Sequence, residues 1–164
     1  MSSKLKTFLF CIAIPLLVGG IAGFLTSPGM NLYQQLEQPP FAPPGFLFPI
    51  VWTILYVLMG LASFFIVTSF EPDRNKNREL THKKHQALSF YALQLFFNFL
   101  WPILFFNCNL YLIAFIWLLA LWLLILICVY LFYAVNKKAA YLMIPYFLWV
   151  TFAAYLNLGV YILN

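Results

Sequence analysis

Aromatic, amide and small side chains recur at helical spacing in three apolar stretches of the sequence. Side chains three, four or seven positions apart project from one face of a helix, so each set should form a stripe. The sets are, in chain order, Trp52, Tyr56 and Gly60; Gln94, Asn98 and Trp101; and Trp149, Ala153 and Asn157. If the stripes converge, indole and phenol faces with a few amides would line an apolar cavity suited to a large, flat, hydrophobic ligand.

The apolar stretches contain no Asp, Glu, Lys, Arg or His. Buried ionisable groups usually mark proton relays and ion paths in membranes, so their absence argues against an ion-coupled pump and against chemistry that needs a buried carboxylate. His82 and His85 could ligate a metal or haem, although histidines on a solvated loop are far commoner. Cys11, Cys108 and Cys128 have neither metal-ligand nor disulfide spacing. We predict no catalytic residue and no metal site.

A purely structural interpretation of the stripes remains open. Amides and small residues hold helices together in lipid, and Trp and Tyr near helix ends anchor proteins at the membrane interface. Gly19 and Gly23 form a pair of small residues four positions apart, which could pack against another helix within the chain or across a dimer.

The composition places these stretches in a membrane. Of the 164 residues, 65% are hydrophobic and 8% are charged, against roughly 25% charged in a soluble domain. Five uncharged stretches each fit a crossing of about 20 residues, and backbone groups in lipid must bond within their own helix. We therefore predict an all-α integral membrane protein with a single membrane domain, residues 1–164, and helices at about 7–26, 46–69, 87–106, 110–133 and 140–162.

The nine basic residues predict the orientation. With five crossings they all fall on one side, at residues 4–6, 74–84 and 137–138, while Glu37 is the only charge on the other side. By the positive-inside rule the N-terminus is cytoplasmic and the C-terminus is outside. The net charge of +5 is thus a topology signal and does not indicate nucleic-acid binding. Cleavage as a signal peptide is the less favoured alternative, because no small-residue cleavage site precedes a soluble domain.

Two longer connections are predicted. Residues 27–45 are rich in proline and glycine, interleaved with Tyr33, Leu36 and Phe41. Because proline disrupts regular helices and the apolar side chains would be poorly solvated, this segment should fold back onto the helix ends as a structured loop and a candidate lid over the cavity. Residues 71–85 are charged and are predicted to form a solvated loop.

Several spaced blocks resemble the translocator protein family, also called tryptophan-rich sensory proteins or peripheral-type benzodiazepine receptors. The blocks are Tyr33-x-x-Leu36-x-x-Pro39, PPFAPPGFLFPIVWTILYVLMG at 39–60, LQLFFNFLWPILFF at 93–106 and PYFLWVTFAAYLN at 145–157. They cover most of the chain after the first helix, in the family's order and spacing.

The resemblance implies a five-helix bundle, commonly a homodimer, that binds porphyrins such as protoporphyrin IX or haem beneath the first loop, and in some members sterols. No obligatory cofactor is implied. Tyr56 and Gln94 are candidate ligand contacts from the stripes alone, and the resemblance carries over the following positions: Tyr33, Trp52, Asn98, Trp101, Trp149, Ala153 and Asn157.

Two features depart from the family pattern. Phe41 stands where a loop tryptophan is usual, and no basic residue follows Tyr155 or Tyr161 as it would in the cholesterol motif of animal members. Sterol binding by the animal mode is therefore doubtful. A bacterial-type member in a plasma membrane is the favoured identity.

Three functions fit the pattern. The leading hypothesis is a tetrapyrrole-binding membrane protein with a regulatory or ligand-handling role. The alternatives are passive passage of porphyrin or another hydrophobic solute along helix seams, and light- and oxygen-dependent porphyrin breakdown, which would need no acid–base pair.

Overall fold

Five long α-helices and one π-helical turn make up the computed structural model, which describes residues 3–33, 35–70 and 72–164 and has no β-strand among them. The elements are α1 (Ser3–Tyr33), α2 (Leu47–Thr68), α3 (Arg74–Pro102), η1 (Ile103–Asn107), α4 (Tyr111–Val135) and α5 (Lys137–Leu163). All five α-helices are long and apolar enough to cross a membrane, η1 continuing the span of α3. The predicted all-α membrane fold with five spans is confirmed.

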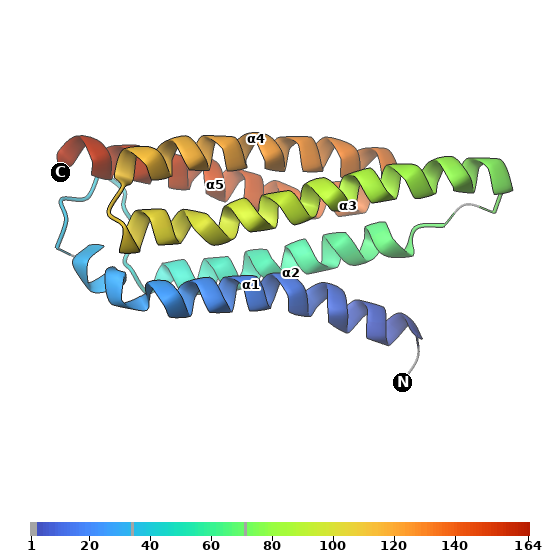
Figure 1. Cartoon of the computed structure of the whole chain (residues 1–164), viewed down its shortest axis with the longest axis horizontal. Helices are drawn as coiled ribbons and strands as arrows, with labels where there is room; N and C mark the ends of the chain where they lie inside the picture. The colour runs from blue at the N-terminus through green and yellow to red at the C-terminus, as the bar shows by residue number, and fades with distance from the viewer. Residues whose placement is uncertain (1–2, 34, 71) are drawn as a thin grey trace.

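Successive helices run antiparallel, so the two chain ends lie at opposite ends of an elongated bundle (Figure 1). The most extensive contacts join α1 to α2, α2 to α5, α5 to α4 and α4 to α3, and α3 with η1 returns to α1. All nine basic residues lie toward the end that holds the N-terminus. We call this the basic end, and the opposite end, which holds residues 35–46, the loop end.

Helix α1 extends beyond its predicted end at residue 26, to Tyr33, although Pro28 lies inside it. Pro28 has no N–H to donate to the carbonyl of Phe24, and the Ser27 hydroxyl donates to that carbonyl instead, at 2.9 Å. Side chains that replace a missing backbone bond let membrane helices tolerate proline. The prediction that a non-helical connection starts at residue 27 was wrong for this reason.

Helix α3 begins at Arg74 and not near residue 87, so most of the predicted solvated loop is helical. The Asp73 carboxylate caps it by accepting from two backbone N–H groups, at 2.9 and 3.1 Å. Glu79 and Lys83 form an ion pair one turn apart, at 2.7 Å. An N-terminal cap and an ion pair between helical turns stabilise a helix without apolar residues. The helix therefore begins before the apolar stretch from which it was predicted.

The described residues 35–46 of the proline-rich connection lie against the end of α5, as predicted, but hydrogen bonds hold them there, and the side chain of Phe41 is 88% exposed. The side chain of Asn164 accepts from the N–H of Glu37 and donates to the carbonyl of Glu37, both at 3.0 Å. The Tyr155 hydroxyl donates to the carbonyl of Pro40 at 2.9 Å. These bonds fix the described residues 35–46 over the loop end of α5.

Helix α1 is the least buried span: 17% of the residues in its most apolar stretch are buried, against 39% in α2. Two close approaches hold it. An added Cβ at Gly60 of α2 would lie 2.8 Å from the Cα of Ile12, and one at Gly29 would overlap the carbonyl oxygen of Phe106 in η1. Between these two points α1 also approaches the Tyr56 ring, at Gly19, and a cavity opens beside Gly20 and Gly23.

Candidate ligand-binding site

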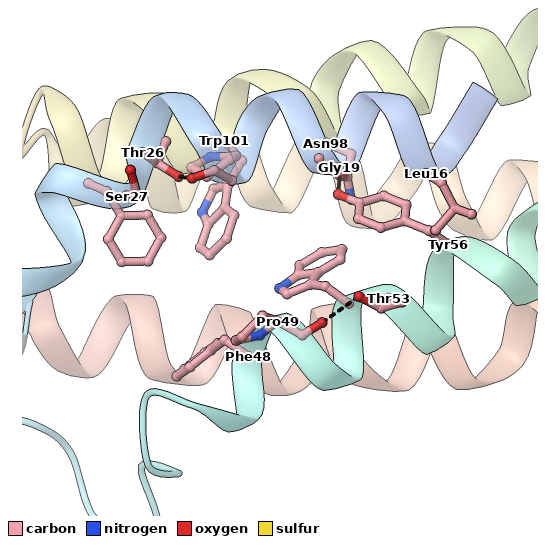
Figure 2. Close-up of a pocket in the computed structure, with 15 residues that line it drawn as sticks. Leu16, Gly19, Thr26, Ser27, Phe48, Pro49, Thr53, Tyr56, Asn98 and Trp101 are labelled. Atoms are coloured by element: carbon pink, nitrogen blue, oxygen red, sulfur yellow. Dashed lines mark hydrogen bonds between the residues drawn. The ribbon is translucent and has the colours of Figure 1, made fainter. Parts of the chain in front are cut away.

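A cavity of about 490 Å³ lies between α1, α2 and the end of α3 (Figure 2). Small-molecule sites commonly have volumes of this order. Residues of α1 form one wall and residues of the first half of α2 form another, while Asn98, Trp101, Pro102 and Phe106 close the back. None of the described residues 35–46 lines it, so this part of the proline-rich loop does not form the roof that the sequence suggested.

Glycines shape the α1 wall. An added Cβ at Gly19 would overlap the Tyr56 ring, so glycine lets α1 approach α2 there. At Gly20 and Gly23 nothing lies within 4 Å of an added Cβ, and both residues are exposed. The Gly19–Gly23 pair, for which helix packing was predicted, therefore lines the cavity as well and leaves it open on this side.

Trp52 is at the centre of the aromatic surface. Its ring stacks on Tyr56 with centroids 5.5 Å apart and lies 6.3 Å from the ring of Trp101. The rings of Trp52 and Tyr146 meet edge to face, with centroids 6.1 Å apart. Phe48, one turn before Trp52, continues the surface toward the loop end (Figure 2). Flat aromatic faces held by neighbours in this way suit stacking against a planar ligand.

A chain of side-chain hydrogen bonds supports this surface from behind. The Tyr56 hydroxyl donates to Asn98 Oδ1 at 2.6 Å, and Asn98 Nδ2 donates to the Tyr146 hydroxyl at 2.8 Å. Tyr146 in turn donates to Gln94 Oε1 at 2.9 Å. Gln94, Asn98 and Tyr146 are 0%, 2% and 0% exposed, so the bonds lie where water cannot compete. They join α2, α3 and α5.

A second set of bonds holds the back wall. The Trp101 indole N–H donates to Asn157 Oδ1 at 3.1 Å, and Asn157 Nδ2 donates to the carbonyl of Tyr111 at 2.8 Å. All three amides of the predicted stripes thus have partners on other helices, and the three stripes meet inside the bundle. This is the helix-joining role that the structural interpretation expected, and it coexists with a cavity.

Four predicted contact residues line the cavity: Trp52, Tyr56, Asn98 and Trp101. Three others, Gln94, Ala153 and Asn157, are buried without lining it.

Tyr33 and Trp149 lie beside the cavity. Tyr33 packs against Phe48 and Phe106 with centroids 6.0 and 5.7 Å away, and burial raises the pKa of its phenol, so the hydroxyl stays protonated. The Trp149 ring lies 6.1 Å from that of Phe48, and its buried N–H has no hydrogen-bond partner among the described residues. Ligand contact by these two residues stays a prediction.

Sequence reasoning missed Tyr146 and the α1 wall. Tyr146 precedes Trp149 by three positions and Ala153 by seven, so the stripe on α5 begins one turn earlier than predicted. The α1 wall has no aromatic or amide signal, since it consists of three glycines together with Leu16, Thr26 and Ser27. His82 and His85, considered as ligands for a metal or haem, are exposed on α3.

The sequence profile of the TspO/MBR family matches residues 11–163, which include every wall of the cavity. The chain belongs to the TspO/MBR family. The resemblance seen in the sequence blocks is therefore confirmed.

Bacterial and animal relatives both align along most of this family member. A "Tryptophan-rich protein TspO" of Chlorobaculum tepidum is 34% identical over 100% of the chain and 99% of its own length. The "Tryptophan-rich sensory protein" of Cereibacter sphaeroides is 32% identical over 96% of the chain and 89% of its own length. The "Translocator protein" of Ovis aries is 33% identical over 85% of the chain and 79% of its own length.

Replacing Tyr146 by Phe should destabilise the bundle, because the change leaves Asn98 Nδ2 and Gln94 Oε1 buried without this partner. We expect a loss of about 1–2 kcal/mol in the free energy of unfolding, measured by denaturant titration in mixed micelles. Tyr141→Phe is the control, since the Tyr141 side chain is 58% exposed and should not matter. Equal stability of the two variants would contradict the claim that the hydrogen bonds of Tyr146 stabilise the bundle.

Proposed function

We propose that this TspO/MBR family member binds a flat hydrophobic tetrapyrrole, such as protoporphyrin IX or haem, in the cavity between α1, α2 and α3, and has a regulatory or ligand-handling role. The observation that carries the proposal is the aromatic surface of Trp52, Tyr56 and Trp101 facing a space of about 490 Å³. A planar macrocycle gains most from broad, rigid ring faces.

The shape and polarity of the walls support this ligand class. The cavity is mostly apolar, with a few hydroxyls and the amide of Asn98, which suits a large ring with a small polar edge. The glycine wall at Gly20 and Gly23 leaves room for a wide molecule. A sensing or ligand-handling role also agrees with the names of the relatives, "sensory protein" and "translocator protein".

Replacing Trp52 by Leu should weaken protoporphyrin IX binding about tenfold, because the change removes the central stacking face. The ligand's own absorbance shift is the readout, so the loss of an indole does not alter the signal. Trp122→Leu is the matched control: Trp122 donates to Thr151 at 2.8 Å and does not line the cavity. If Trp52→Leu bound protoporphyrin IX with wild-type affinity, the assignment of the binding site to this cavity would be wrong.

Trp149→Leu distinguishes the cavity from the wider site predicted from sequence. Because Trp149 touches Phe48 but does not line the cavity, the variant should bind nearly as well as the wild type. A loss as large as that of Trp52→Leu would place the ligand closer to α5 than we propose.

We further propose that the basic end faces the cytoplasm, in the plasma membrane of a bacterium. The grouping of all nine Lys and Arg residues at that end supports the orientation, and the bacterial relatives support the choice of membrane. The cysteines offer a test, since Cys108 is exposed near the loop end while Cys11 and Cys128 are buried.

A membrane-impermeant maleimide should label Cys108 in intact cells, because the loop end would face outward. Lys4→Cys in a Cys108→Ser background should be labelled only after the membrane is opened. The Cys108→Ser protein without an added cysteine serves as the blank, because its two remaining thiols are buried. The reverse labelling pattern would invert the orientation.

A further inference from the structure

The hydroxyl groups that line the cavity already donate their hydrogens to the protein. Three of them donate to backbone carbonyls of their own helix: Thr26 to Ala22 at 2.8 Å, Ser27 to Phe24 at 2.9 Å and Thr53 to Pro49 at 2.7 Å. A hydroxyl that has donated its single hydrogen keeps only acceptor capacity. Toward a ligand, these side chains therefore act as acceptors.

The other polar side chains that line the cavity also donate hydrogens to groups within the protein. Tyr56 donates to Asn98, Asn98 donates one amide hydrogen to Tyr146, and Trp101 donates its indole hydrogen to Asn157. Among the described lining residues, the side-chain donors that remain are the second amide hydrogen of Asn98 and the indole N–H of Trp52. The cavity is rich in acceptors and poor in donors.

No cation compensates for this shortage. The described residues that line the cavity include no Lys, Arg or His, and all nine basic residues of the chain belong to the basic end. The loop end has Glu37 as its only charged residue. An ionised carboxylate accepts hydrogen bonds but cannot donate them, and burying one without a partner is strongly unfavourable.

We infer that the cavity selects the uncharged form of its ligand. This inference rests on the proposed function and deepens it: a tetrapyrrole enters with its carboxyl groups esterified or protonated, so that they do not bring negative charge among acceptors. A protonated carboxyl group or another O–H or N–H edge supplies the hydrogens that the walls can accept. Ionised propionates are excluded from the same space.

The test compares protoporphyrin IX with its dimethyl ester, which has the same ring but no carboxylates. The protein is held in nanodiscs of zwitterionic phosphatidylcholine, and affinities are expressed per mole fraction of ligand in the bilayer, so that the ester's greater lipid solubility does not count. We expect the ester to bind about tenfold tighter at neutral pH, because burying an unpaired carboxylate is disfavoured.

A lysine at the edge of the cavity should abolish this preference. Gly20 is exposed and lines the cavity, with nothing within 4 Å of an added Cβ, so a side chain fits there. Relative to Gly20→Met, Gly20→Lys should bind the diacid about tenfold tighter and the ester equally well. Gly20→Met is the uncharged control of similar length. Thr53→Lys with Thr53→Met repeats the comparison from α2 if the first pair does not fold.

The outcomes separate the inference from the proposed function. A diacid that binds the wild type as tightly as the ester, or tighter, overturns the inference and leaves the proposed function intact. If neither lysine variant reduces the preference for the ester, the difference in affinity is due to hydrophobicity, and the inference is also overturned. Binding of neither porphyrin overturns the proposed function, and the inference fails with it.

Discussion

The amide of Asn98 is the constraint on which the centre of this bundle depends. It is 2% exposed, accepts from Tyr56 on α2 and donates to Tyr146 on α5. Inside a bilayer no water replaces a lost partner, so three helices must keep their positions for this group to be satisfied. Trp52 stacks on the ring that Asn98 holds, and the flat wall of the cavity follows from that bond.

The cavity exists because α1 does not share in this network. It approaches α2 closely at Gly19 and opposite Gly60, and η1 at Gly29. It lines the cavity with glycines where the other helices contribute rings. The polar groups that face the space have mostly donated their hydrogens within the protein. The cavity thus lies between a rigid aromatic wall and a wall of glycines, and hydrogen bonds within the protein determine which of its polar groups remain free for a ligand.

The sequence predicted what depends on hydrophobicity and periodicity. Long uncharged stretches predicted five spans, and helical spacing brought Trp52, Asn98 and Asn157 onto faces that do meet. It failed where a local polar group decides the outcome: the Ser27 hydroxyl keeps α1 helical at Pro28, and the Asp73 cap extends α3. Which stripe residues line open space depends on how far α1 stands away, and spacing within one helix contains no such information.

The most direct test of this account is the coupling free energy between Tyr56 and Asn98. It is obtained from the unfolding of four proteins in mixed micelles: the wild type, Tyr56→Phe, Asn98→Ala and the double variant. A buried bond that holds the aromatic wall should give a favourable coupling of about 1 kcal/mol, near the middle of the range for hydrogen bonds between membrane helices. Strictly additive effects would show that Asn98 does not position Tyr56, and the cavity wall would need another explanation.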